Sequence, residues 1–319
     1  MKIVILDANT LGDDLDLSVY DDFGEVEVYG FTSKEQVVER IKDANVIITN
    51  KIVLDESNLK YARNLQLICL TATGTNNVDK NYTNAHGIVV SNVVGYSTES
   101  VVQHTFALLF YLYENLSYYD RYVKSGTYVG DSVFSHFENK YNEINGKTWG
   151  IIGLGTIGKR VADVASCFGC RMIYYSTSGN NHSTEYEKVN LDTLIRTSDI
   201  ISIHAPLNEN TDDLITYKEF INMKDTAVIL NLGRGRIINE NHLAKALKEE
   251  LIAGAGIDVL EHEPINEGNP LLDIQDSGKL FITPHIAWAS VEARQRVIIE
   301  IKENIASYIK GTPRNVVTK

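Results

Sequence analysis

Cysteine is scarce in this sequence, and long apolar runs are absent from it. Three cysteines in 319 residues do not provide a disulfide framework. No window of about 18 residues is wholly apolar, so no membrane-spanning helix is predicted. The opening MKIVILDANT is typical of a strand and lacks the apolar stretch and cleavage site of a signal peptide. We therefore expect a cytoplasmic chain that does not contact a membrane.

Clustered positive charge is also lacking. Lys and Arg number 30 against 42 Asp and Glu, which leaves a formal net charge of −12. A protein that follows a phosphate backbone needs runs of basic residues, and the sequence contains none. Nucleic acid is therefore not the expected partner.

A second pair of metal ligands is missing beside the one C-x-x-C motif, Cys167 and Cys170. A zinc site needs such a second Cys/His pair. The surrounding VADVASCFGCRMIYY is typical of a helix end, a glycine stop at Gly169 and a following strand. We expect the two thiols to flank that helix end, and we expect no bound metal.

What the sequence does contain is short apolar runs that alternate with amphipathic stretches. Continuous runs of Ile, Val and Leu are typical of strands buried on both faces of a parallel sheet. Their alternation with helices predicts an α/β fold with doubly wound parallel sheets. The expected strands are residues 2–8, 26–31, 45–50, 65–74, 87–92, 148–155, 171–177, 199–205, 227–233, 254–259 and 280–285, and the helical patterns include 33–44, 157–169 and 239–250.

The alternation falls into two blocks, one ending near Ser97 and one near Trp288. A long apolar helix is expected to follow Ser97 and run to Gly126, because no Pro or Gly interrupts its pattern. The final helix, residues 289–311, begins after the second block closes, and we infer that it returns to the first. The predicted domains are residues 1–98 with 289–319, for substrate, and residues 99–288, for a dinucleotide.

A glycine-rich loop opens the second block. KTWGIIGLGTIGKRVADVA places G-x-G-x-x-G at Gly153, Gly155 and Gly158, between a predicted strand and a predicted helix. In dinucleotide-binding folds these glycines permit the turn, the approach of the pyrophosphate and close helix–strand packing. Free N–H groups at Thr156 and Ile157 would then face the phosphates. A glycine turn with only a structural use is the alternative.

Three strands of the second block are followed by ionisable side chains, Arg234, Glu263 and His285. Ligands in doubly wound folds bind beyond the carboxyl ends of the strands. A guanidinium can hold a substrate carboxylate, an imidazolium can protonate a carbonyl oxygen as hydride reaches its carbon, and a carboxylate stabilises that imidazolium. Singly, each residue could be a cap, a solvated charge or a core histidine. Together, after a dinucleotide loop, they predict hydride transfer to a 2-keto acid.

At these residues the chain resembles the D-2-hydroxyacid dehydrogenase family. The resemblance covers nearly the whole length and rests on GIIGLGTIGKRVA, HAPLNENTDDLI, NLGRGRIINENHLAKAL, GAGIDVLEHEP and TPHIAWAS. TATGTNNVD and SNVVGYSTESVVQHTFALL, with TPHIAWAS, are most similar to the glycerate dehydrogenase/hydroxypyruvate reductase branch. The resemblance implies a flavodoxin-like substrate domain and a Rossmann-type nucleotide domain with a cleft between them. It also implies a homodimer, with the long helix after Ser97 in the interface.

The resemblance implies roles for individual residues. Arg234, Glu263 and His285 would be catalytic, and Asp258 would meet the nicotinamide amide. The other implied cofactor contacts are Gly153, Gly155, Thr156, Ile157, Gly158, Ser176, Thr177, His204, Pro206, Thr211, Leu232 and Gly233.

On the substrate side, backbone N–H groups of Thr73 and Gly74 would bind the carboxylate. Trp288 would face the substrate's side chain. Lys51 is either a plain surface lysine or a group that meets a substrate hydroxyl or phosphate. The implied substrate site is completed by Arg234 and His285.

The implied reaction transfers a hydride between NAD(P)H and a small 2-keto acid to give a D-2-hydroxy acid, with hydroxypyruvate/glycerate or glyoxylate/glycolate favoured. The alternative is a non-enzymatic NAD(H)-sensing protein of the C-terminal-binding co-repressor type, which shares the fold, the three catalytic residues and a Trp after the His. Such co-repressors carry long flanking tails, which we do not expect in a chain whose last helix ends so near Lys319.

One residue that the fold normally requires is absent. The strand RMIYYST should end in an Asp or Glu that binds the adenosine ribose, yet Ser176 stands there and no acid occurs from Arg171 to Thr184. Ser176 and Thr177 can donate hydrogen bonds to a 2′-phosphate, but STSGNNH contains no Arg or Lys to pair with it. We therefore expect NAD and NADP both to bind.

Overall fold

The computed structural model describes residues 1–317, and its chain forms two compact units. Unit 1 comprises Met1–Ser97 and the segment from Ala289 onward, and unit 2 comprises Thr98–Trp288. These limits differ by one residue from the expected domains, whose last two residues, Thr318 and Lys319, lie outside the described part. Within that part, no helix is both long enough and apolar enough to cross a membrane.

Unit 1 is built on a sheet of five parallel strands in the order β2-β1-β3-β4-β5. Every residue of β3 and β4 is buried, as the apolar runs predicted for a sheet covered on both faces. The strands are β1 (Lys2–Ile5), β2 (Glu25–Val28), β3 (Val46–Thr49), β4 (Leu67–Leu70) and β5 (Val89–Ser91); the helices are α1 (Val37–Ile41), α2 (Glu56–Leu59), α3 (Lys80–Ala85) and α10 (Val291–Ile309); and 3-10 turns span Ala8–Leu11, Ser18–Phe23 and Lys34–Gln36.

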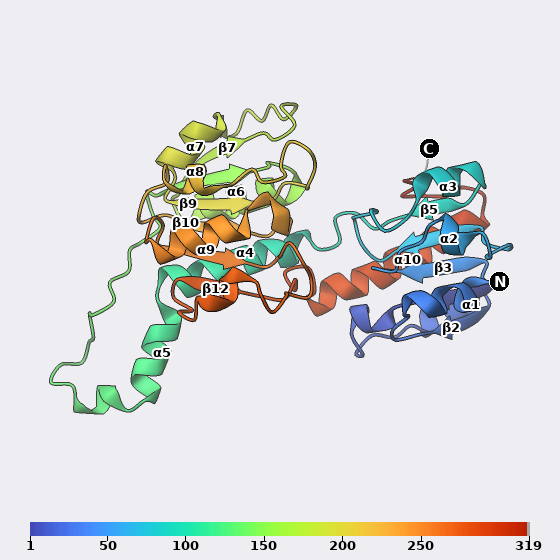
Figure 1. Ribbon diagram of the computed structural model, residues 1–319, viewed down its shortest axis with the longest axis horizontal. Coiled ribbons are helices and arrows are strands. Elements are labelled where there is room, and N and C mark those ends of the chain that lie inside the picture. Colours follow the sequence, from blue (N-terminus) through green and yellow to red (C-terminus); the bar gives the residue numbers. More distant parts are fainter. Residues whose placement is uncertain (318–319) are drawn as a thin grey trace. The chain divides into compact units, whose positions relative to one another are not determined.

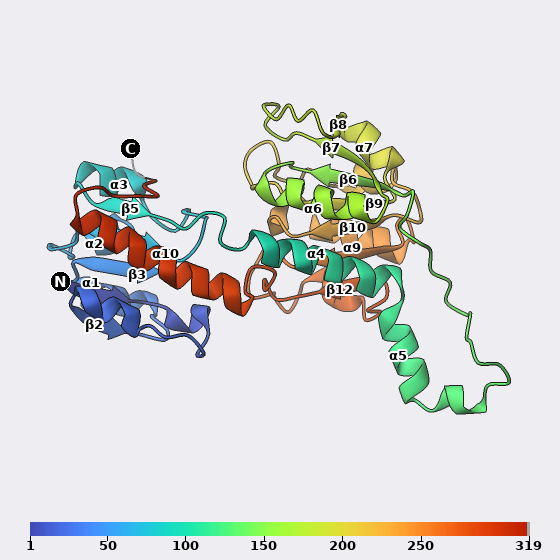
Figure 2. The ribbon, with the colours of Figure 1, turned by 180° about the vertical axis from the view of Figure 1, so that it is seen from behind.

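The final helix, α10, belongs to unit 1, where Figure 2 shows it along one face of the sheet. Its buried residues recur every three or four positions, which is the stripe of a helix packed on a core. Tyr20 donates a hydrogen bond to the Ile298 carbonyl at 3.2 Å. The side chain of Asn304, only 1% exposed, donates to the Asn92 carbonyl at 3.0 Å and accepts from Asn315. These buried polar contacts anchor the C-terminal segment to the N-terminal sheet.

Unit 2 contains seven parallel strands in the order β12-β11-β10-β9-β6-β7-β8 (Figure 1), so the predicted doubly wound parallel sheets are confirmed in both units. The strand order changes direction between β6 and β9, and such a switch point is where ligands bind. The strands are β6 (Thr148–Ile152), β7 (Arg171–Tyr175), β8 (Glu187–Lys188), β9 (Ile200–Ile203), β10 (Val228–Asn231), β11 (Gly254–Ile257) and β12 (Leu280–Ile282).

Helices cover both faces of the seven-stranded sheet, and neighbouring strand residues belong to different cores. Ile151 packs with residues of α4 and α6, whereas Ile152 packs with residues of α7, α8 and α9. This two-sided burial explains the continuous apolar runs. The helices are α4 (Thr98–Tyr113), α5 (Leu116–Lys124), α6 (Thr156–Cys167), α7 (Leu191–Thr197), α8 (Tyr217–Phe220) and α9 (Glu240–Lys248), with 3-10 turns at Thr127–Gly130, Gly235–Ile237 and Pro270–Asp273.

The prediction of a single long helix from Ser97 to Gly126 is wrong, because this segment forms two helices, α4 and α5. Asn115 between them adopts a left-handed conformation with φ of +53°. Asn tolerates this conformation better than most side chains, and one such residue ends a helix. The glycine stop predicted at the end of α6 is confirmed by Gly169, whose φ is +82°.

The anchoring role of the buried Asn304 amide can be tested by substitution. We expect Asn304→Leu to lower the free energy of unfolding of unit 1 by about 1–3 kcal/mol, because the Asn92 carbonyl loses its buried donor. Calorimetric unfolding would measure the change. Glu303→Ala is the control, since Glu303 is an exposed neighbour on the same helix. Equal stability of the two variants would contradict the anchoring role.

Candidate active site

The glycine-rich loop connects β6 to α6 and has the shape that a bound pyrophosphate needs. Gly153 has a φ of +91° and permits the turn. A Cβ on Gly158 would lie 2.3 Å from the Gly153 carbonyl oxygen, so α6 can pack this closely only on a glycine. Among the described residues, a Cβ on Gly155 would meet nothing within 4 Å except its own chain neighbours. The exposed Gly155 and Thr156 thus leave open space at the helix N-terminus, which fits a dinucleotide phosphate.

Several predicted cofactor residues follow β9 and β10, next to this loop in the sheet order. The backbone N–H of His204 donates to Ile152 at 2.9 Å and extends the β6–β9 pairing. Burial lowers the pKa of His204 to about 3, which keeps its imidazole neutral. Thr211 is buried, and its hydroxyl donates to the Pro206 carbonyl at 2.7 Å. The predicted cofactor residues Leu232 and Gly233 directly follow the last residue of β10.

Arg234 follows Gly233 in an extended conformation and exposes its side chain. The Asn231 amide donates to the Arg234 carbonyl at 2.9 Å, and its oxygen accepts from the Gly233 N–H at 3.1 Å. The guanidinium donates to the Gly233 carbonyl at 2.8 Å. The last residue of β10 therefore holds the turn that presents Arg234 beyond the strand.

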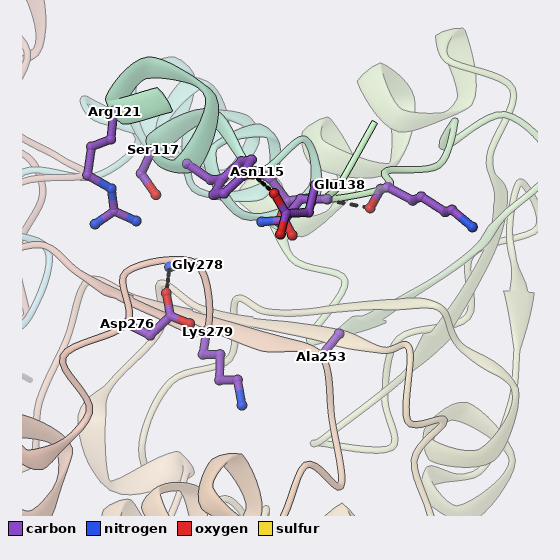
Figure 3. A pocket seen from close by; sticks show the side chains of 11 residues that line it. Asn115, Ser117, Arg121, Glu138, Ala253, Asp276, Gly278 and Lys279 are labelled. Atoms are coloured by element: carbon purple, nitrogen blue, oxygen red, sulfur yellow. Dashed lines mark hydrogen bonds between the residues drawn. The ribbon is translucent and has the colours of Figure 1, made fainter. Parts of the chain in front are cut away.

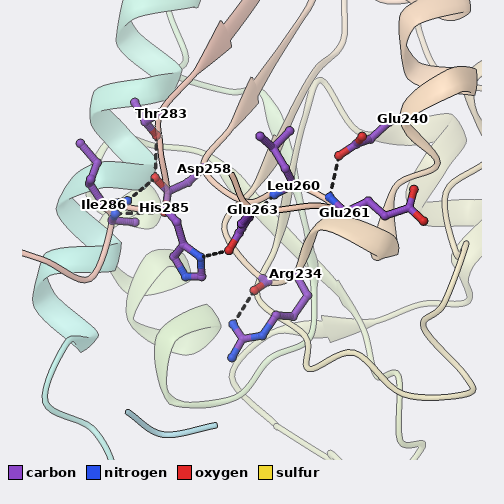
Figure 4. Close-up of polar contacts among 11 residues, drawn as sticks. Arg234, Glu240, Asp258, Leu260, Glu261, Glu263, Thr283, His285 and Ile286 are labelled. Carbon is purple, nitrogen blue, oxygen red and sulfur yellow. Dashed lines mark hydrogen bonds and ion pairs between the residues drawn. The ribbon is translucent and has the colours of Figure 1, made fainter. Parts of the chain in front are cut away.

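His285 and Glu263 form a direct pair (Figure 4). The distance from His285 Nδ1 to Glu263 Oε2 is 2.7 Å. The other Glu263 oxygen accepts from the Leu260 N–H at 3.0 Å, which orients the carboxylate. With Nδ1 directed at Glu263, Nε2 is the nitrogen that can exchange a proton with a ligand. Figure 4 shows the Arg234 side chain extending beyond the strand ends on the side of the pair.

His285 itself is held in a strained backbone conformation with φ of +54°. Its N–H donates to the Asp258 carbonyl at 2.8 Å. The Asp258 carboxylate, 2% exposed, accepts from the Thr283 hydroxyl at 2.6 Å and from the N–H groups of Ile286 and Ala287 at 2.9 and 3.0 Å. Asp258 therefore holds the segment on both sides of His285.

Sequence reasoning missed two residues that support this arrangement. His104 of α4 lies 3.0 Å from the Thr283 hydroxyl, and burial lowers its pKa against the opposing effect of the Asp258 charge. Glu240 of α9 accepts a hydrogen bond at 2.7 Å from the N–H of Glu261, which lies two residues before Glu263 in the chain. A histidine in an otherwise apolar helix, as in QHTFALL, was the available signal for the first. For Glu240 the sequence contains no comparable signal.

The loop after β7 contains Ser176, which is buried at the place of the missing acid. Its oxygen accepts from the Asn181 N–H at 3.2 Å. Thr177 follows and is partly exposed. Elsewhere in unit 2, Trp288 packs against the core formed with α4 and α6.

The predicted substrate residues Lys51, Thr73 and Gly74 lie in unit 1, beyond the carboxyl ends of β3 and β4. The buried Asp7 carboxylate accepts from the Lys51 N–H at 2.8 Å, and the Lys51 side chain is exposed. The Thr73 hydroxyl donates to the Val93 carbonyl at 2.8 Å, and the Asn92 amide donates to the Thr73 carbonyl at 2.8 Å. Unit 1 thus brings these turns to one edge of its sheet.

A polar pocket of about 690 Å³ in unit 2 contains none of the predicted site residues (Figure 3). It lies between the start of α5 and the loop before β12, where the Asp276 carboxylate accepts from the Gly278 N–H. Across residues 1–317, no cluster of three or more His, Cys, Asp or Glu side chains is arranged to hold a metal ion.

The family model "D-isomer specific 2-hydroxyacid dehydrogenase, NAD binding domain" matches residues 106–287. A hydroxypyruvate reductase of Blautia hydrogenotrophica is 36% identical over 100% of both chains. A glycerate dehydrogenase of Methylorubrum extorquens is 34% identical over 99% of this chain and 98% of its own.

Solved structures show the same fold. An acyclic imino acid reductase in complex with NADPH and D-Arg is 30% identical, with a TM-score of 0.87 over 99% of this chain and 100% of its own. A D-lactate dehydrogenase of Aquifex aeolicus, complexed with NAD and lactic acid, is 25% identical, with a TM-score of 0.86 over 100% of this chain and 99% of its own.

The two glycines of the loop should respond differently to an added methyl group. We expect Gly158→Ala to destabilise unit 2 by about 1–3 kcal/mol, because its Cβ would overlap the Gly153 oxygen. Gly155→Ala should leave the melting temperature unchanged, because within residues 1–317 its Cβ would meet no atom within 4 Å apart from its own chain neighbours. It should nevertheless weaken NADH binding at least about tenfold, since the methyl group occupies the open space. Unchanged NADH affinity by titration calorimetry would remove Gly155 from the phosphate site.

Proposed function

We propose that this chain, which belongs to the D-isomer specific 2-hydroxyacid dehydrogenase family, reduces a small 2-keto acid to the D-2-hydroxy acid. It is an NAD(P)-dependent oxidoreductase that acts on CH–OH donors. The observation that carries this proposal is the 2.7 Å pair of His285 and Glu263, at the strand ends next to Arg234. A proton donor held by a carboxylate, together with a guanidinium for the substrate carboxylate, is what reduction of a 2-keto acid requires.

In the proposed mechanism, the guanidinium of Arg234 binds the substrate carboxylate and polarises the adjacent carbonyl. His285 Nε2 delivers a proton to the carbonyl oxygen, and Glu263 stabilises the imidazolium through Nδ1. The reduced nicotinamide, when bound, supplies the hydride. In the reverse direction His285 accepts the proton from the hydroxyl group.

We further propose which residues bind the two ligands. The cofactor contacts are those expected from the sequence, including Asp258 at the nicotinamide amide, and the open space beside Gly155 supports them. N–H groups of Thr73 and Gly74 bind the substrate carboxylate from unit 1, with Lys51 available to a substrate hydroxyl or phosphate. Trp288 limits the size of the side chain. Hydroxypyruvate and glyoxylate are the favoured substrates, as the names of the relatives support.

A kinetic matrix tests the proposed function. NADH and NADPH are each measured at 340 nm with glyoxylate, hydroxypyruvate, pyruvate and a bulkier 2-keto acid. The expected result is the fastest turnover with one of the first two. Tight cofactor binding without turnover of any 2-keto acid would instead support a non-enzymatic nucleotide-sensing protein.

A homodimer in the cytoplasm is the proposed state. Figures 1 and 2 show α5 and the following loop extending away from the sheet of unit 2. This extension exposes Val129, Phe134 and Phe137, at 88%, 91% and 76%, which is typical of a surface that another chain covers. The three cysteines are free thiols, in keeping with a reducing compartment. Light scattering on the purified chain measures the dimer directly.

His285→Ala should separate chemistry from cofactor binding. We expect kcat to fall by about 10²–10⁴-fold, because the proton donor is lost, while NADH affinity changes by less than about twofold. His86→Ala is the matched control, since His86 is exposed in unit 1 and has no proposed role. A large loss of NADH affinity in His285→Ala would place His285 in cofactor binding and contradict its catalytic role.

A further inference from the structure

The sequence leaves a 2′-phosphate without a cation in the loop after β7, but the structure brings one there from another strand. Lys188 lies on β8, and its Nζ donates to the Gly179 carbonyl at 3.0 Å. Gly179 closes the turn that begins at Ser176, since its N–H donates to the Ser176 carbonyl at 3.2 Å. The ammonium group therefore lies against the turn in which the ribose-binding acid is replaced.

The strand pairing explains how Lys188 reaches this turn. β8 pairs in parallel with β7, with Tyr174 opposite Lys188, so both strands end at the same edge of the sheet. The loop itself is folded back against the glycine-rich loop. The Asn181 N–H donates to the Ser176 hydroxyl oxygen at 3.2 Å, and the Asn181 amide donates to the Leu154 carbonyl. The turn from Ser176 to Gly179 thus lies between the phosphate-binding loop and Lys188.

The charges around the turn leave Lys188 available to a ligand. Of the nearby acids, Glu187 pairs with Arg171 at 2.7 Å and Glu185 pairs with Lys159 at 2.8 Å. Within residues 1–317, Lys188 has no carboxylate partner within 4.0 Å. An ammonium group has three donors, and the Gly179 carbonyl uses one of them. Two donors remain for a phosphate.

We propose that Lys188 is the cation that binds the 2′-phosphate of NADPH, and that the protein prefers NADPH to NADH. The proposal rests on the proposed function, because it concerns the same cofactor site. The Ser176 hydroxyl accepts from Asn181 and so keeps its own proton to donate to the phosphate. A phosphate monoester is nearly dianionic at pH 7, and charge-assisted hydrogen bonds are the strong ones. NADH carries only a hydroxyl at this position, so it forms no ion pair with Lys188.

Binding of two cofactor fragments tests the proposal without turnover. Titration calorimetry compares 2′,5′-ADP, which contains the 2′-phosphate, with 5′-AMP, which lacks it. Wild-type protein should bind 2′,5′-ADP about five- to tenfold more tightly. Lys188→Gln should abolish this difference and leave 5′-AMP affinity within about twofold. Lys188→Arg should retain it.

Lys218→Gln is the matched control, because it removes the same charge from an exposed site on α8 of the same unit. It should leave the preference intact. Equal binding of the two nucleotides by wild-type protein, an unaltered preference in Lys188→Gln, or an equal loss in Lys218→Gln would each overturn the role of Lys188. In all three cases 5′-AMP and NADH still bind, so the proposed function stands. Failure of wild-type protein to bind NADH, NADPH and both fragments would instead overturn the proposed function.

Discussion

The buried carboxylate of Asp258 is the constraint on which the site in unit 2 depends. It accepts from Thr283, Ile286 and Ala287, and its own backbone carbonyl accepts from His285. A buried carboxylate without donors is costly, whereas one with three donors is stable and rigid. The end of β11 therefore holds the segment after β12 in place, and with it the unfavourable φ of His285. The pairing of His285 with Glu263 follows from this arrangement.

The parallel sheet supplies the second constraint. Because every strand of unit 2 runs the same way, the glycine-rich loop, the Arg234 turn and the His285 segment all emerge at one edge. Close packing at Gly158 sets the distance between α6 and β6. The open space at Gly155 lies on the side of the loop where a ligand would bind. The proposed cofactor and catalytic residues thus share a scaffold that is densely packed in the core and open beside the glycine-rich loop.

Much of this could be predicted, and the failures have physical causes. Apolar runs and glycine spacing located the strands and the nucleotide loop, because two-sided burial leaves a continuous signal. The break at Asn115 was missed, because the sequence does not show that this Asn adopts a left-handed conformation. Strand β8 was missed because it is two charged residues at a sheet edge, without an apolar pattern. The supporting role of His104 depends on Thr283, which is distant in the chain.

The sequence by itself determined the fold class and the family, and it singled out Arg234, Glu263 and His285 as candidates, because burial patterns, turn glycines and ionisable side chains after strands are local properties. Only the tertiary structure decided which groups meet. It placed Asp258 under the His285 segment, Glu240 beside the Glu263 segment and Lys188 against the turn at Ser176. Hydrogen bonds and charge pairs depend on distances of about 3 Å, and strand pairing sets such distances between residues far apart in the chain.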